Sequence, residues 1–181
     1  MFRIIDTLTE LNSINDQWDK LTEVQGEGNV HSTFSWLYTW WSIYEKHREP
    51  FDYVYKLSVL YYENSEDRGI APLMLEKRQD GDILCFLGEG VSDYSDFLIS
   101  GDKGKFFKDM IVFLKGSFDV KAVRLQQFPS TSPNYKALLS ALEEFGIAYD
   151  DEEIEKCPYI TIENEWDKYY STVKKSMRAD I

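Results

Sequence analysis

The chain has 181 residues, of which 43% are hydrophobic and 15% are aromatic. This composition predicts one domain with a sizeable core and excludes an intrinsically disordered chain. The formal net charge of −12 makes nucleic acid and anionic membrane surfaces poor partners, because the surplus carboxylates repel phosphates.

The cysteines and the apolar runs bear on where the chain works. Cys85 and Cys157 lie far apart and form no CxxC pair, so we expect no disulfide framework and a reducing, cytoplasmic environment. No apolar run is long enough to span a membrane, and "MFRIIDTLTE" has no signal-peptide core. We therefore do not expect membrane insertion.

Two helices are predicted after a short strand at residues 2–5. Thr7 and Glu10 form a capping-box pattern that begins a helix running to about Val24. A second helix begins near Ser32 and carries two apolar stripes, one of Phe34, Leu37, Trp41 and Tyr44, the other of Trp36, Trp40 and Ile43. A helix that is apolar on two sides needs a sheet on one side and a further layer or a partner on the other.

Strands dominate the middle of the chain. They are predicted at residues 53–63, 69–77, 83–87 and through "YSDFLI", and Pro72 indicates an edge or a bulge because it cannot donate to a ladder. A helix follows "SGDKG" and ends at Gly116.

The last third of the sequence alternates strands and helices. A strand is predicted at "KAVRLQ", and Ser132 with Pro133 begins a helix that Gly146 closes. "CPYITIE" is the last predicted strand. Asn164 and Asp167 begin a final helix, whose apolar side holds Trp166, Tyr169, Tyr170, Val173 and Met177 and whose pattern is unfinished at Ile181. This element order predicts the α/β (α+β) class, with a mixed central sheet flanked by helices.

The stretch "GEGVSDYSDFLIS" holds the candidate site residues Asp93, Tyr94 and Asp96. Gly88 and Gly90 are interpreted as turn glycines, and the three residues as the start of a central strand. In an extended strand a spacing of three puts Asp93 and Asp96 on opposite faces, which disfavours a paired acid and base. Hydrogen bonding within the turn is the favoured role, and lining a substrate cleft is the second.

Other chemistry finds little support in the sequence. His31 and His47 have no second ligand at metal spacing, and the acidic run Asp150–Glu155 lacks the pattern of a calcium loop. No GxSxG, Walker or Rossmann motif occurs. We therefore predict neither a catalytic residue nor a metal ligand in this chain.

Five segments in this order resemble the cellulose-biosynthesis-associated (CelD-like) acetyltransferases, which are relatives of the FemABX peptidyl transferases. They are "TFSWLYTWWSIYEK", "GIAPLML", "FLGEGVSDYSDFLI", "FPSTSPNYKALLSALEEFG" and "CPYITIENEWDKYYSTVKKSMRADI". The likeness covers nearly the whole chain and implies the GNAT (acyl-CoA N-acyltransferase) fold. In that family two GNAT-like halves lie in tandem, and the second binds the acyl donor.

The resemblance assigns residues 1–163 to the first half and residues 164–181 to the start of a helix that leads to a missing second half. An acetyl-CoA site in a GNAT half needs a [Q/R]-x-x-G-x-[G/A] loop before a helix, and no register of "ISGDKGKFFKDM" fits it. Asp102 would also cap an amide there and repel phosphate. We therefore expect no cofactor in this chain and acetyl-CoA in the second half.

The leading hypothesis is a non-catalytic half of an acyltransferase that packs on the catalytic half and shapes the cleft for a saccharide or cell-envelope acceptor. The alternative is a stand-alone binding or assembly module that self-associates. The expected partner is thus a second GNAT half or a homodimer mate. An independently active N-acyltransferase conflicts with the failed phosphate loop.

Overall fold

The computed structural model describes residues 1–25, 29–47, 54–156, 158, 166–174 and 176. Their contacts divide the chain into two units, residues 1–149 and residues 150–181. The first unit contains two four-stranded sheets, with the strand orders β1–β3–β4–β7 and β2–β5–β6–β8. The strands are β1 (Phe2–Ile5), β2 (Val54–Leu57), β3 (Val59–Glu63), β4 (Arg68–Ala71), β5 (Leu73–Lys77), β6 (Ile83–Phe86), β7 (Leu98–Ser100) and β8 (Ala122–Arg124). The helices are α1 (Leu8–Ser13), α2 (Asn15–Gln25), η1 (Val30–Ser32), α3 (Phe34–His47), α4 (Lys103–Ser117), α5 (Pro133–Glu144) and, in the second unit, α6 (Trp166–Thr172).

The two sheets share one long antiparallel hairpin. Only Ser58 separates β2 from β3, and only Pro72 separates β4 from β5. The pairing register runs unbroken through both gaps, because Leu57 pairs with Met74 in one sheet and Leu60 pairs with Ala71 in the other. Pro72 has no N–H to donate, so the ladder is interrupted at this position. The predicted strands 53–63 and 69–77 are therefore real extended segments, each shared by two sheets.

A parallel pair makes the fold mixed. β8 pairs with β6 in parallel, whereas every other strand pair in the described residues is antiparallel. Helix α4 lies between these two strands in sequence, as a parallel crossover requires. This arrangement confirms the predicted α/β class with a mixed sheet and flanking helices.

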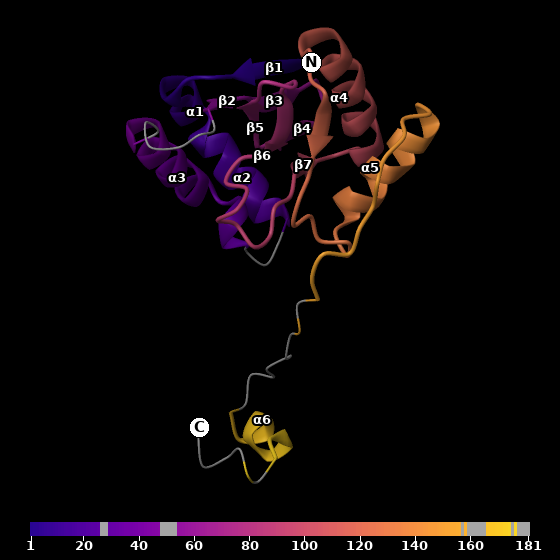
Figure 1. Cartoon of the computed structure of the whole chain (residues 1–181). Coiled ribbons are helices and arrows are strands. Elements are labelled where there is room, and N and C mark those ends of the chain that lie inside the picture. The colour runs from indigo at the N-terminus through magenta and orange to yellow at the C-terminus, as the bar shows by residue number, and fades with distance from the viewer. Residues whose placement is uncertain (26–28, 48–53, 157, 159–165, 175, 177–181) are drawn as a thin grey trace. The chain divides into compact units, whose positions relative to one another are not determined.

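Both faces of the strands are buried, and side chains alternate between two cores. Val59, Tyr61 and Met74 belong to a core with α1, α2 and α3, and Leu60, Tyr62 and Leu73 to a core with α4 and α5. Figure 1 shows the first three helices on one side of the strands and α4 and α5 on the other. Burial on both faces explains why the strands read as continuous apolar runs in the sequence.

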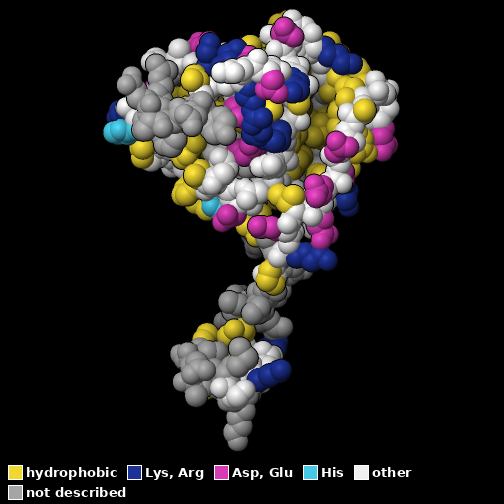
Figure 2. All heavy atoms as spheres, in the orientation of Figure 1, with side chains coloured by type: hydrophobic (Ala, Val, Ile, Leu, Met, Phe, Trp, Pro, Cys, Tyr) yellow, Lys and Arg dark blue, Asp and Glu magenta, His cyan; other side chains and the backbone are white. Residues whose placement is uncertain are grey.

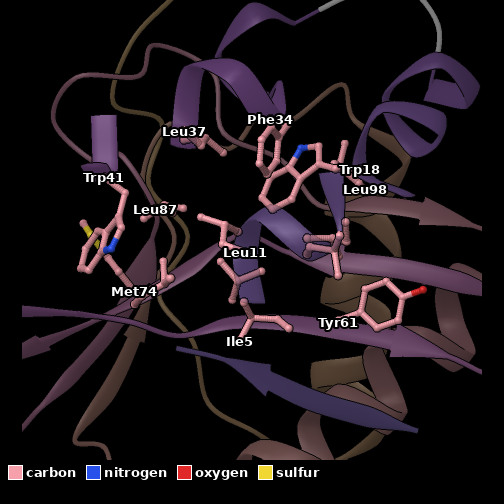
Figure 3. Close-up of a cluster of buried hydrophobic side chains, with 14 of the residues drawn as sticks. Ile5, Leu11, Trp18, Phe34, Leu37, Trp41, Tyr61, Met74, Leu87 and Leu98 are labelled. Atoms are coloured by element: carbon pink, nitrogen blue, oxygen red, sulfur yellow. The ribbon is translucent and has the colours of Figure 1, made fainter. Parts of the chain in front are cut away.

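Trp18 lies at the centre of the first core. Its ring is fully buried and packs edge-on against Phe34, with 5.9 Å between the ring centroids (Figure 3). The indole N–H donates to the carbonyl oxygen of Ser32 at 2.8 Å. This bond satisfies the one polar atom of the side chain and ties α2 to the start of α3.

The two stripes predicted on α3 differ in burial. Phe34, Leu37, Trp41 and Tyr44 are all buried in the first core, as expected. Trp36 and Trp40 are only partly buried against it, and Ile43 is 56% exposed. Hydrophobic side chains reach the surface around α3 in Figure 2. The second side of this helix is therefore only partly covered by residues of the first unit.

Several predicted boundaries differ from the structure. The first helix is divided at Ile14, where the backbone leaves helical geometry and both Ile14 and Trp18 turn into the core. The predicted strand through Asp93–Phe97 is wrong, because strand pairing begins only at Leu98. The predicted strand "CPYITIE" lies outside the described residues apart from Pro158.

The second unit contains one short described helix. In α6 the rings of Tyr169 and Tyr170 lie 5.5 and 6.3 Å from that of Trp166, which is 57% exposed. The predicted apolar side is therefore present over this span, and Asn164 and Met177 lie outside the described residues. Asp150–Glu155 precedes it as an exposed acidic segment, as predicted.

None of the helices in the described ranges has the length and apolar character that crossing a lipid bilayer demands.

Candidate functional site

The stretch that held the candidate residues is an excursion from the sheet. Phe86 at the end of β6 pairs with Leu73, and Leu98 at the start of β7 pairs with Ile70. Only Ala71 and Pro72 lie between those two partners. The much longer segment Leu87–Phe97 must therefore leave the sheet after β6 and return to it at β7, where the chain continues alongside the β4–β5 segment. We call this segment the excursion loop.

Two glycines begin the excursion loop. Gly88 has φ 83° and Gly90 has φ 88°, a backbone conformation that residues with a Cβ rarely adopt. The amides of Val91 and Ser92 both donate to the carbonyl of Gly88, at 3.1 Å. These contacts support the interpretation of both residues as turn glycines. The indole of Trp36 donates to Ser92 Oγ at 3.1 Å, which holds the loop against α3.

Asp96 joins the end of the excursion loop to the start of α5. Its carboxylate accepts three hydrogen bonds: from the Phe97 amide at 2.6 Å, from Ser132 Oγ at 2.7 Å and from Asn134 Nδ2 at 2.9 Å. Ser132 is itself the N-cap of α5, since its hydroxyl oxygen accepts from the amide of Asn134. Burial raises the pKa of Asp96, although these donors work in the opposite direction. The carboxylate therefore joins the excursion loop to the start of α5, and both of its oxygens already accept hydrogen bonds.

The start of α4 is occupied in the same way by carboxylates of the chain. Asp102 is the N-cap and accepts from the amide of Lys105 at 2.9 Å, as its position in the sequence predicted. Asp67 accepts from the Asp102 amide at 3.1 Å, and a Cβ on Gly101 would lie 1.9 Å from the same oxygen. Hydrogen bonds from Asn64 and from the Asp102 amide lower the pKa of Asp67. Two negative charges thus lie where a phosphate would have to bind.

An open hollow of about 790 Å³ lies where these elements meet. Its lining is mostly uncharged and polar, and comes from α2, from η1 and the residue before it, from the excursion loop, from β7, and from the first residues of α4 and α5 with the loop before α5. The residues that matter most here are Gln25, Asn29, Tyr94, Asp96, Lys103, Ser132 and Asn134. The amide of the Asn29 side chain donates to the Tyr94 carbonyl at 3.0 Å and so connects two of these segments.

The structure separates the three predicted site residues. Tyr94 and Asp96 line the hollow, whereas Asp93 is exposed and is not among the lining residues. No contact in the described residues brings Asp93 and Asp96 together as an acid and base pair. A substrate-binding role for the three residues stays a prediction.

Sequence reasoning missed most of the hollow. Ser132 was expected only as a helix cap, and Asn134 and Lys103 carried no signal of a site. Asn134 is almost fully buried and donates to both Asp96 and the Phe97 carbonyl, at 2.9 and 2.7 Å. These residues reach the excursion loop only through the tertiary fold, so local sequence patterns do not indicate that they lie together.

Nucleophilic and metal chemistry finds no geometric support in the part of the chain that the structure describes. Burial raises the pKa of Cys85 to about 12, so its thiol is not a ready nucleophile. His31 packs its ring 5.1 Å from Trp36 and 6.3 Å from Tyr94, and His47 is exposed at the end of α3. Among the described residues no group of three or more His, Cys, Asp or Glu side chains is placed to hold a metal ion.

No family model, curated protein or solved structure matches this chain. The resemblance to the CelD-like acetyltransferases therefore stays an expectation drawn from its sequence motifs. What the site does must be argued from its own residues.

We predict that Asp96→Ala lowers the free energy of unfolding by about 1–3 kcal/mol, because three donors lose their acceptor in a partly buried place. Thermal or urea unfolding measures it. Asp93→Ala is the matched control, since that exposed carboxylate should change stability by no more than about 0.5 kcal/mol. Equal losses in the two variants would show that the Asp96 contacts are not what stabilises this region.

Proposed function

We propose that this chain is a GNAT-like domain of an acyltransferase that does not hold the acyl donor, and that its hollow contributes to the acceptor site. The strand order supports the first part of the proposal. When the two sheets are taken together, the strands lie side by side in the order β1, β2–β3, β4–β5, β6–β7 and β8. Along the chain, α4 follows β7 and α5 follows β8. This order is compatible with a GNAT domain.

One observation supports the absence of the acyl donor from this domain. In a GNAT domain the helix after the fourth strand receives the pyrophosphate of the acyl donor on its free amides. The corresponding helix here is α4, and Asp67 and Asp102 already occupy the amides of Asp102 and Lys105. A donor phosphate would have to displace both carboxylates, against a formal net charge of −12.

The hollow suits an uncharged polar ligand. Its amide and hydroxyl groups can donate and accept, Tyr94 is 39% exposed, and Asp96 is already paired. Saccharides are recognised by such planar amide groups and aromatic faces, so a saccharide or cell-envelope acceptor, as the family resemblance implies, is chemically reasonable here. The catalytic half would complete the cleft as the partner of this domain.

A self-associating binding module is the second candidate. The partly covered side of α3, with Ile43 56% exposed, favours it, because monomers seldom leave large apolar patches in water. In that case a second copy would cover the helix, and the hollow would have no enzymatic role.

We predict that acetyl-CoA does not bind to this chain, because the carboxylates at α4 exclude its phosphates. Isothermal titration at low salt should show no binding for the wild type. The double variant Asp67→Asn, Asp102→Asn removes two charges with little change of shape and should gain measurable affinity for inorganic pyrophosphate. A low-micromolar dissociation constant of the wild type for acetyl-CoA, about −8 kcal/mol, would falsify the non-catalytic assignment.

The acceptor role predicts weak binding of a saccharide in the hollow. A tetrasaccharide of β-1,4-linked glucose, titrated into the labelled protein, should shift the amide NMR signals of Gln25, Asn29 and Tyr94. Tyr94→Ala should abolish these shifts, whereas Tyr149→Ala, an equally exposed tyrosine outside the hollow, should not. Unchanged signals of Gln25, Asn29 and Tyr94 in the wild type would contradict the acceptor role.

A further inference from the structure

A connected group of four charged side chains lies outside the hollow, in which Glu76 is buried, Glu89 and Arg124 are partly buried and Arg78 is exposed. Glu76 on β5 is 1% exposed and accepts from Arg78 Nε at 2.6 Å and from Arg124 Nη2 at 2.8 Å. Arg124 also donates from Nε to Glu89 Oε1 at 2.9 Å, and its Nη2 makes a second bond to the same oxygen. Burying charges is expensive, so a cluster that is this well connected calls for a reason.

Its members come from places that matter for the hollow. Glu89 lies between Gly88 and Gly90, where the excursion loop leaves β6. Arg124 is the last residue of β8, directly before the loop that leads to Ser132 and α5. The ion pair therefore joins the bases of the two loops that Asp96 joins at their far ends.

A backbone contact lies between these two connections. The amide of Ser95 in the excursion loop donates to the Gln127 carbonyl at 3.0 Å. Gln127 adopts a φ of 56°, which is uncommon for a residue with a side chain. The loop after β8 thus takes a strained backbone conformation at the residue whose carbonyl meets the excursion loop.

We infer that Glu89 and Arg124 are positioning residues, which hold the excursion loop against the loop after β8 and so keep the hollow in shape. Arg124 is suited to this task because its planar guanidinium serves Glu76 on the sheet and Glu89 on the loop at once. Glu76 anchors the arginine to the sheet, and Glu89 connects it to the excursion loop. The importance of the hollow rests on the proposed function, but the holding of the loop does not.

The charges around Glu89 come from every neighbouring strand. Tyr55 on β2, Glu76 on β5, Arg78 directly after β5, Cys85 on β6 and Arg124 on β8 are the groups to consider. Burial raises the pKa of Glu89, and Arg124 offsets this only in part. Burial would also raise the pKa of Glu76, but the bonds from Arg78 and Arg124 outweigh it and the pKa is lowered. Burial therefore disfavours the ionised form of Glu89. The uncharged carboxyl group can still accept a hydrogen bond from Arg124, so the contact does not require the charge.

Amide hydrogen exchange at Ser95, measured by NMR on the full chain, tests the inference. Glu89→Ala and Arg124→Ala should each speed exchange at Ser95 by about tenfold or more, while Tyr61 in β3 reports any general loss of stability. Glu89→Gln keeps an acceptor for Arg124, so it should restore exchange to within about threefold of the wild type. Arg78→Ala is the matched control, because it breaks a bond to Glu76 without touching Glu89.

A pH series adds a measurement that needs no destabilised variant. Because the folded pKa of Glu89 is raised, the loop contact is favoured at low pH and loses stability as the pH rises through that pKa. After correction for intrinsic exchange, opening at Ser95 should therefore increase more steeply with pH in the wild type than in Glu89→Gln, where the neighbouring Asp96, whose pKa burial also raises, still titrates.

Unchanged exchange at Ser95 in Glu89→Ala, or an equal effect of Arg78→Ala, would overturn the positioning role. An identical pH dependence in the wild type and Glu89→Gln would count against it as well. Failure of the tetrasaccharide to bind the wild type would instead overturn the proposed function and leave this inference standing.

Discussion

The hydrogen bonds of the Asp96 carboxylate are the contact on which the candidate site depends. They join the excursion loop to the N-cap of α5, which are distant in sequence and belong to different strand lines. Together with the bond from Asn134 to the Phe97 carbonyl, they hold Ser132 and Asn134 beside the excursion loop. Three donors on one carboxylate also explain why Asp96 remains buried despite the cost of removing it from water. The hollow is therefore shaped by this polar contact as well as by the packing of Phe97 against Phe128, whose ring centroids lie 5.5 Å apart.

The same principle governs the helix termini around the hollow. Both α4 and α5 direct their N-terminal ends toward it, and helix N-termini favour anions. In each case the chain supplies the anion itself, with Asp102 and Asp67 at α4 and Asp96 at the cap of α5. These carboxylates compete with a ligand phosphate for the helix N-termini. This competition is the physical basis of the proposal that the domain does not bind the acyl donor.

The sequence predicted what depends on local patterns. Thr7, Asp102 and Ser132 cap helices as their spacing indicated, and the α/β class followed from the order of elements. Only the end of the excursion loop, Asp93–Phe97, was misread as the start of a strand, because "DFLI" has the composition of a strand and its last two residues do belong to β7. Only the pairing of β6 with β5 and of β7 with β4, two strands separated by Pro72 alone, shows that the loop must leave the sheet.

The candidate site was predictable only in part for the same reason. Asp96 drew attention through its neighbours, but its partners Ser132 and Asn134 lie in another segment. The cluster of Glu76, Glu89 and Arg124 is likewise assembled from three segments and gives no local signal. Hydrogen bonds between distant segments depend on the tertiary fold, which a single sequence does not reveal.

The most direct measurement is the titration of individual aspartate carboxyl carbons by NMR. We expect Asp96 to titrate above the ordinary pKa of an aspartate, because it is buried in the contact that shapes the hollow. Asp67 should titrate below the ordinary value, because Asn64 and the amide at the start of α4 bind its anion. If both carboxyl groups titrate like exposed aspartates, neither is engaged as described, and the central contact of the site is absent in solution.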